Sequence, residues 1–282
     1  MPKHTILRAI APLAFIAVQF LLMTGAAAVD VGESARFKAG KPCLRCDLRY
    51  VDAQGAQLRG SDLRGAYMFN VNLVRAELIE ARLESVNLEM ANLERADLTR
   101  VRMDRASAPG AALAGATLVK ASMRHFSAPG ANFDTADLSE AGLMAAQLPG
   151  TSLVFAFAER TIFISANLRN ANLRNARMNE AQMVDTNLTG ATLDGARLER
   201  ANLRRANLAQ ASLVGTRMGH ANLSGANLTG AVLRAADLTG VNLTGADLRN
   251  ADLTGAEMGS TVLEAARLCG ATMSDGRRQP PC

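Results

Sequence analysis

The chain has 282 residues, of which 49% are hydrophobic but only 4% aromatic, and it contains no tryptophan. Its formal charge is +5, from 31 basic and 26 acidic residues. A surplus this small suits solubility and does not indicate a nucleic-acid-binding protein.

Residues 1–28 are typical of a secretory signal peptide. Lys3 and Arg8 precede an apolar run over residues 10–23, and the segment ends in Thr-Gly-Ala-Ala-Ala, which holds an Ala-x-Ala site. We expect cleavage after Ala28 and delivery to the periplasm or the exterior, with no membrane span left. The formal charge then falls to +3, because Lys3 and Arg8 are lost and no acidic residue is. The alternative is an uncleaved anchor in the inner membrane, since the apolar run is near the lower length of a span.

The stretch from Cys46 to Met273 repeats a five-residue phrase, small-x-Leu-x-x. Its clearest portion, residues 221–253, begins Ala-Asn-Leu-Ser-Gly and Ala-Asn-Leu-Thr-Gly. The first position is mostly Ala, the third is mostly Leu, and neither holds a charged residue anywhere in the stretch. A fixed period that never slips predicts a repeat architecture.

A period of five excludes the common structures. On an α-helix five residues advance about 500°, so successive leucines would wander around the surface. On a continuous strand successive leucines would alternate faces, because five is odd. A short extended piece followed by a two-residue corner keeps the first and third positions on one interior. We therefore predict that the chain coils into a solenoid.

The tandem Ala-x-Leu-x-x phrases resemble the pentapeptide-repeat family, and the resemblance covers about four fifths of the chain. It implies an all-β fold, a right-handed quadrilateral parallel β-helix with four phrases to a coil and about 11 coils. The central Leu and the preceding small residue would lie inside.

Two features favour a coil of 20 residues. Pro-Gly pairs at 109–110, 129–130 and 149–150 are spaced by 20 and suit the middle of a type II turn. The charged residues at 80, 100, 120, 140, 160, 180 and 200 mostly alternate in sign, which would place opposite charges on adjacent rungs.

Both ends of the repeat, residues 46–273, are expected to be capped. Residues 29–45 fall outside the strict period and would cover the first coil, whose open edge could otherwise pair with another chain. Residues 274–282 would form a C-terminal capping tail. We expect no helix after the signal peptide.

The cysteines indicate two local disulfides. Cys43 and Cys46 are the first and fourth residues of an expected corner turn, whose ends lie within about 7 Å, close enough for a disulfide. The Cys-Leu-Arg-Cys-Asp-Leu segment also resembles the opening of exported family members. A redox pair or half of a zinc site is less favoured, because a thioredoxin-like context and two further ligands are missing nearby. The segment around Cys269 resembles the family's closing segment and implies a bridge to Cys282.

From residue 151 to 165 the phrase degenerates while its phase holds. Large apolar residues in this segment fall on outward positions. Two more, Met144 and Val184, lie 20 residues before and 20 residues after Ile164. We expect these residues to form one exposed apolar patch, a candidate contact surface: Met144, Val154, Phe155, Phe157, Ile162, Ile164 and Val184. Drift of the phrase explains the pattern equally well, because β-branched and aromatic residues favour strands without binding anything.

The remaining outward residues give little support for catalysis. Arg177, Arg197 and Arg217 fall in one outward column that could bind an anion or an acidic partner, but a solvated face is favoured because long Arg stems can diverge in water. His125 and His220 lie at turns about five coils apart and cannot share a site. We therefore predict no catalytic, cofactor-binding or metal-binding residue and no cofactor.

The sequence thus favours a non-enzymatic exported protein, a rigid structural or protein-interaction module of the periplasm or cell envelope. Its partner would be an envelope protein or a second copy of the chain, not a nucleic acid. The alternative is the DNA-mimic role of some family members, which resemble duplex DNA and bind topoisomerases. That role needs a strongly acidic surface in the cytoplasm, whereas this chain is basic and begins with an export signal.

Overall fold

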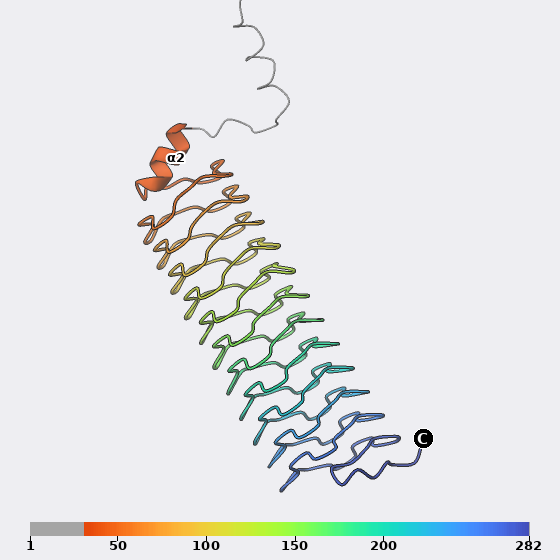
Figure 1. The fold of residues 1–282 in the computed structure, drawn as a ribbon. Helices are drawn as coiled ribbons and strands as arrows, with labels where there is room; N and C mark the ends of the chain where they lie inside the picture. Colours follow the sequence, from red (N-terminus) through yellow and green to blue (C-terminus); the bar gives the residue numbers. More distant parts are fainter. Residues whose placement is uncertain (1–30, 282) are drawn as a thin grey trace, which may run out of the picture.

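The structure is a computed structural model that describes residues 31–281. The signal peptide predicted at residues 1–28 lies outside the described residues. The described chain forms a straight rod of stacked coils with one short helix at its N-terminal end (Figure 1). Within residues 31–281 we find no helix with the length and apolar character needed to cross a membrane.

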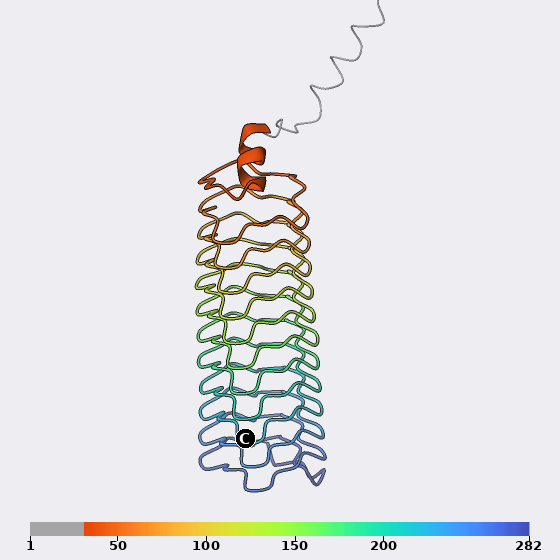
Figure 2. The ribbon, with the colours of Figure 1, turned by 90° about the vertical axis from the view of Figure 1, so that its left-hand side faces the viewer.

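Each coil of the rod contains 20 residues. Parallel bridges join residues 20 apart without interruption, from Asp47 with Tyr67 to Asp252 with Thr272. The bridges are single residues, because each extended piece is only about three residues long before the chain turns. Two perpendicular views show the rungs stacked along the rod (Figures 1 and 2). The predicted quadrilateral parallel β-helix is confirmed.

The interior of the rod is filled by the first and third residues of each phrase. Leucines such as Leu173 and alanines such as Ala171 are essentially inaccessible to solvent. Five threonines also occupy inward positions, and each hydroxyl donates a hydrogen bond to a backbone carbonyl, as from Thr161 Oγ1 to Leu138 O at 2.7 Å. Burial of a hydroxyl is tolerated when it has such a partner. The same pairing is made by Thr151, Thr186, Thr216 and Thr261.

The corners are four-residue turns with one residue of positive φ. At Pro109-Gly110 the N–H of Ala111 donates to Ala108 O at 3.2 Å, and Gly110 has φ of +63°. This is the arrangement expected for Pro and Gly in a type II turn. The same φ region holds at the fifth position of every phrase up to residue 270, including bulky residues such as Phe155 at +57°. The coil geometry therefore imposes this conformation whatever the residue.

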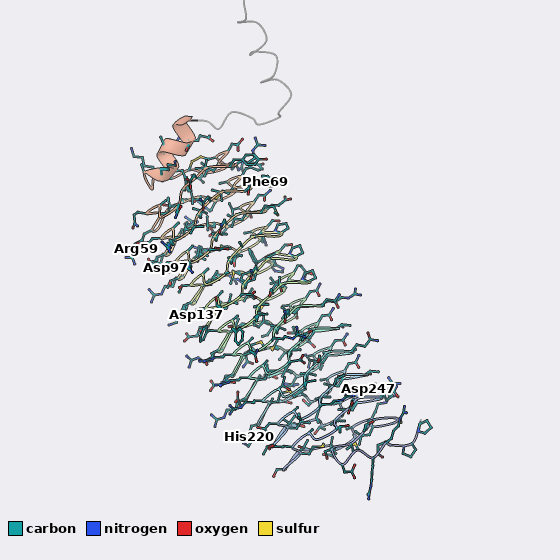
Figure 3. All side chains as sticks on the ribbon, in the orientation of Figure 1. Arg59, Phe69, Asp97, Asp137, His220 and Asp247 are labelled. Atoms are coloured by element: carbon teal, nitrogen blue, oxygen red, sulfur yellow. A yellow bond between two sulfur atoms is a disulfide. The ribbon has the colours of Figure 1, made fainter. Side chains whose placement is uncertain are left out.

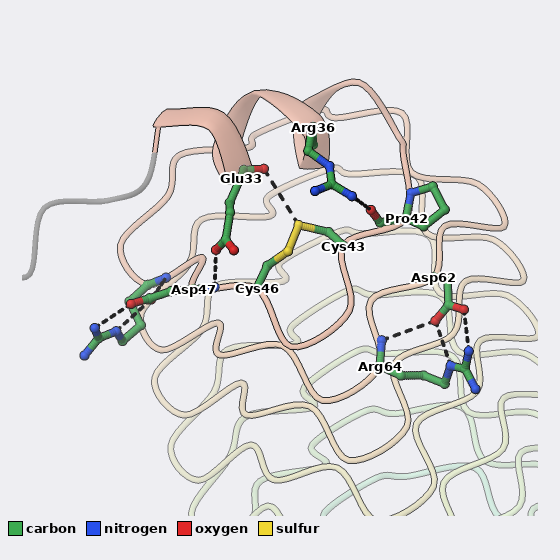
Figure 4. The surroundings of a disulfide bond; sticks show 9 residues. Glu33, Arg36, Pro42, Cys43, Cys46, Asp47, Asp62 and Arg64 are labelled. Atoms are coloured by element: carbon green, nitrogen blue, oxygen red, sulfur yellow. Dashed lines mark hydrogen bonds and ion pairs between the residues drawn. A yellow bond between two sulfur atoms is a disulfide. The ribbon is translucent and has the colours of Figure 1, made fainter.

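The N-terminal end is covered by helix α2 (Val31–Lys38), so our expectation of no helix after the signal is wrong. Phe37 of α2 is fully buried, and Glu33 Oε2 accepts a hydrogen bond from Asp47 N at 2.7 Å (Figure 4). Directly beneath α2, Cys43 and Cys46 form a disulfide with Cα atoms 5.4 Å apart. Eight residues are too few to show a helical period beside so strong a five-residue repeat.

The C-terminal tail folds back along the last coil. Thr272 and Arg278 form an antiparallel bridge, and Gln279 N donates to Ala271 O at 2.7 Å. Gly270 N donates to Pro280 O at 2.9 Å, so the tail pairs with one side of the terminal edge. Cys269 is disulfide-bonded. Cys282, its predicted partner, lies outside the described residues.

Candidate interaction surface

The functional chemistry of the rod must lie on its four outer faces, because the inward positions are filled. We name the faces by their outward bridge residues, each series continuing in steps of 20: face A (47 to 267), face B (52 to 272), face C (57 to 257) and face D (62 to 262). Corners AB, BC, CD and DA are the turns between them. Figure 3 shows Asp97 and Asp137 of face C along one side of the rod and Asp247 of face A on the other.

Faces A and B are largely uncharged. From residue 87 to 227 the outward residues of face A are only Asn, Ser and Gln. Many of the Asn side chains are held by their own turn, as where Thr189 N donates to Asn187 Oδ1 at 3.1 Å. Such a bond fixes the amide, since the side chain replaces a backbone acceptor at the start of the corner.

The seven residues of the predicted apolar patch do not form one surface, so that expectation is corrected. Val154 and Phe155 lie at corner BC and Phe157 on adjoining face C, whereas Ile162 lies on face D. The other three occupy corner DA, diagonally opposite corner BC: Met144, Ile164 and Val184. The physical reason is that each phrase turns the chain by a right angle. Two phrases therefore place residues on opposite sides of the rod.

Phe155 and Phe157, at and beside corner BC, expose apolar surface. Phe155 is 56% exposed and Phe157 is 38% exposed. The guanidinium carbon of Arg177, one rung further on, lies 4.9 Å from the centre of the Phe157 ring. This is a cation–π distance, so part of the predicted patch is covered by a neighbouring basic side chain.

The predicted arginine column is present on face C. Arg177 bridges Arg197, which bridges Arg217. Arg217 Nε lies 3.0 Å from Glu199 Oε1. Arg177 and Arg197 make no ion pair within residues 31–281. Like charges on adjacent rungs repel each other and destabilise the fold. Within residues 31–281 only Arg217 has an acidic partner, Glu199, that offsets this repulsion.

Five of the seven alternating charges of corner CD form ion pairs as predicted, whereas Glu180 and Arg200 form none within residues 31–281. Arg100 NH1 lies 3.2 Å from Glu80 Oε1, and Glu140 accepts from both Lys120 at 3.4 Å and Arg160 at 3.0 Å. These side chains are exposed, so each pair contributes little free energy individually.

The two histidines lie in separate shallow depressions. His125 lines one with Glu84, Asp104 and Arg124, and His220 lines another with Asp237 and other residues. Burial tends to raise the pKa of Asp104, but hydrogen bonds from Ser122 and the backbone of Arg124 outweigh it and leave that pKa below its ordinary value.

The pKa of Asp237 is also lowered, chiefly by a hydrogen bond from the backbone N–H of Thr239. These acids are therefore held ionised by local donors. Among residues 31–281 no three side chains of His, Cys, Asp or Glu are grouped so as to hold a metal ion.

An exposed aromatic group near the N-terminal end was missed by the sequence analysis. Tyr50 and Phe69 lie on adjacent rungs of corner AB with ring centroids 5.4 Å apart in an edge-to-face arrangement. Tyr67, on face A beside them, is 56% exposed. The 20-residue coil places residues 49–50 and 69–70 in one column. Their spacing in the sequence could therefore have predicted this aromatic pair.

The comparison with family models agrees with this geometry. The model for pentapeptide repeats matches residues 43–65, 62–100, 76–113, 141–179, 181–219, 216–255 and 246–276. The chain belongs to the pentapeptide-repeat family. The right-handed quadrilateral β-helix is the fold of that family. No curated protein sequence matches this pentapeptide-repeat chain.

Solved structures of pentapeptide-repeat proteins are similar to this one. HetL, involved in heterocyst differentiation regulation in the cyanobacterium Nostoc sp. Strain PCC 7120, is 28% identical with a TM-score of 0.48, covering 86% of this chain and 96% of HetL. QnrB1, a plasmid-mediated fluoroquinolone resistance protein, is 15% identical with a TM-score of 0.42, covering 80% and 92%. A pentapeptide-repeat protein of the Arabidopsis thaliana thylakoid lumen is 32% identical over 35% of this chain and 66% of its own, with a TM-score of 0.25.

Proposed function

We propose that this pentapeptide-repeat protein is a non-enzymatic exported module that acts in the periplasm or cell envelope as a rigid structural or protein-interaction rod. The observation that carries the proposal is the filled interior. Because Leu and Ala occupy the inside of every coil, the residues free to act lie on outer ladders of fixed spacing. Such a surface suits recognition of an extended partner better than enclosure of a small substrate.

Export is supported by the two ends of the chain. Residues 1–28 have the order of a signal peptide, and the Cys43–Cys46 bridge suits an oxidising compartment. The helix and the tail at the two ends protect edges that would otherwise pair with other chains. Protected edges suit a protein that must stay folded outside the cytoplasm.

The test is fractionation of cells that produce the full chain, followed by N-terminal sequencing and mass spectrometry without reduction. We expect a periplasmic or secreted protein that begins at Val29. We also expect two local bridges, Cys43–Cys46 and Cys269–Cys282. A protein that begins at Met1 in the cytosol, with free thiols, would contradict export.

The interaction role is tested on the same material. Chemical crosslinking in intact cells, followed by purification, should give a defined adduct with an envelope protein or with a second copy of the chain. A Leu173→Asp variant, which disrupts the core, provides a misfolded control and should give no such adduct. Recovery of a topoisomerase adduct from the cytosol would instead favour the DNA-mimic role.

A further inference from the structure

Face C has an unusual order of charge along the rod. Before Phe157 its outward residues include Glu77, Asp97 and Asp137, with Thr117 between the aspartates. After Phe157 they are Arg177, Arg197 and Arg217. An acidic half and a basic half therefore meet at an exposed aromatic residue.

Within the described chain Arg217 is the only one of these six charged residues that forms an ion pair, with Glu199. Asp97 Oδ1 and Asp137 Oδ1 accept backbone N–H groups of their own turns, from Thr99 and Ser139. Neither aspartate makes an ion pair within residues 31–281, and the same holds for Arg177 and Arg197. Segregated, unpaired charges on one flat face have a cost unless a partner neutralises them.

We propose that face C is a self-complementary surface on which two copies of this chain bind side by side and antiparallel, with the two-fold axis at Phe157. An antiparallel two-fold axis places a residue a given number of rungs before Phe157 opposite the residue the same number of rungs after it. Asp137 then faces Arg177 of the second copy, and Asp97 faces Arg217. Thr117 faces Arg197, a neutral pairing, and the two Phe157 rings meet at the axis.

The edges of the face agree with this register at corner BC. The axis places each corner beside the same corner of the second copy, so the exposed Phe155 rings meet and Asp134 lies opposite Arg174. Arg174 also lies 3.6 Å from Asp194 of its own chain. At corner CD the same axis brings like charges together, because Arg160 meets Arg160 of the second copy, Glu140 faces Glu180 and Lys120 faces Arg200. Glu140 offsets part of this repulsion, since it is paired with Lys120 and Arg160 in its own chain. Matching of charge and apolar area on face C and at corner BC favours a second copy over an unrelated acidic or basic partner.

The position of Phe157 along the rod strengthens the argument. It lies near the midpoint of the 46–273 β-helix, so antiparallel copies centred on it overlap along their whole length. Figure 2, which looks toward the side that carries Asp97 and Asp137 in Figure 3, shows the rungs of this side stacked along the rod. A flat ladder can keep one register over many rungs.

The matched region limits the strength of the dimer. It runs from Asp97 to Arg217 and is about 29 Å long at about 4.8 Å per rung. Beyond it Asp237 would face Glu77, which ends the favourable match. A single face of this length buries less surface area than a standard protein–protein interface. The dimer is therefore weak, and its population depends on protein concentration.

The experiment measures association of the purified full chain by sedimentation velocity at concentrations up to about 1 mM and at low salt. Asp137→Arg and Arg177→Asp should each weaken self-association at least tenfold, because each creates two like-charge contacts. The variant that carries both substitutions should regain it. A mixture of the two single variants should form a heterodimer, since every contact is then between opposite charges. Circular dichroism verifies that each variant is folded.

Arg169→Asp, at corner AB away from face C, is the matched control with the same change in net charge and should self-associate like the unaltered chain. Small-angle X-ray scattering distinguishes the geometry, because a side-by-side dimer keeps the length of one rod whereas an end-to-end dimer doubles it. Absence of dimer at all concentrations, equal effects of Arg177→Asp and Arg169→Asp, or a doubled length would overturn the proposal. The inference deepens the proposed interaction role, and because it uses purified protein its outcome is independent of export.

Discussion

Replacement of Gly195 by Ala should reveal how side chains stack along the corners. Gly195 has φ of +68°, and a Cβ atom there would clash with Asn175 Oδ1 on the preceding rung. Gly245 is the matched control, because it has φ of +65° and no heavy atom within 4 Å of a Cβ. An Ala in this left-handed region costs about 1 to 2 kcal/mol at either site. At Gly195 the displaced Asn side chain adds about 0.5 to 1.5 kcal/mol.

We therefore expect Gly195→Ala to lower the free energy of unfolding by about 1.5 to 3.5 kcal/mol and Gly245→Ala by about 1 to 2 kcal/mol. Urea denaturation followed by circular dichroism measures both. In an Asn175→Ala background the cost of Gly195→Ala should fall to that of the control, which is the pairwise coupling of a double-mutant cycle. Equal destabilisation by the two glycine substitutions, or a cost that Asn175→Ala leaves unchanged, would refute the stacking argument.

Three further predictions concern the core, the surface charges and the N-terminal end. Thr161→Val should cost only about 1 kcal/mol in urea denaturation, because Leu138 O loses the hydroxyl donor but keeps its backbone donor; a loss as large as that of a core Leu→Ala would contradict this. A hydrogen bond from Arg249 lowers the pKa of Asp247, so its stabilisation is present above about pH 3.8 and is lost as the pH falls through the lower folded-state pKa. Asp247→Asn should accordingly destabilise at neutral pH but not in strong acid, as thermal melts across that range would show. Phe37→Ala should speed amide hydrogen exchange in the first coil and leave the central coils unchanged; uniform acceleration would mean that the helix stabilises the whole rod.

The regular part of the fold could be predicted because the five-residue phrase by itself determines which residues pack inside the coil. The spacing of Pro109, Pro129 and Pro149 identified the 20-residue coil, and Gly110 has the positive φ that a type II turn requires. Opposite charges such as Glu80 and Arg100 fall on adjacent rungs as expected. Each of these features depends only on counting residues, which a strict period makes reliable.

The irregular parts could not be predicted in the same way. Helix α2 has Glu33 in its first turn, Arg36 in its last and Gly40 beyond its end, but these are weak signals in a short segment. The apolar residues around Phe155 were correctly placed outside, yet the side of the rod that each occupies needs the corner count as well. The charge order of face C appears only when residues 20 apart are compared over many coils.

The one-dimensional arrangement of the coils has a consequence for how the molecule unfolds. Each coil contacts only the coils before and after it, so loss of structure proceeds most easily from an end, where a coil has one neighbour instead of two. The Cys43–Cys46 bridge and the antiparallel tail at Arg278 are located at these two starting points. Fraying must first expose the buried Phe37 of helix α2 at one end and break the backbone hydrogen bonds of the tail at the other. The end coils should therefore open before the central ones, although nearly all of the buried surface lies between the two ends.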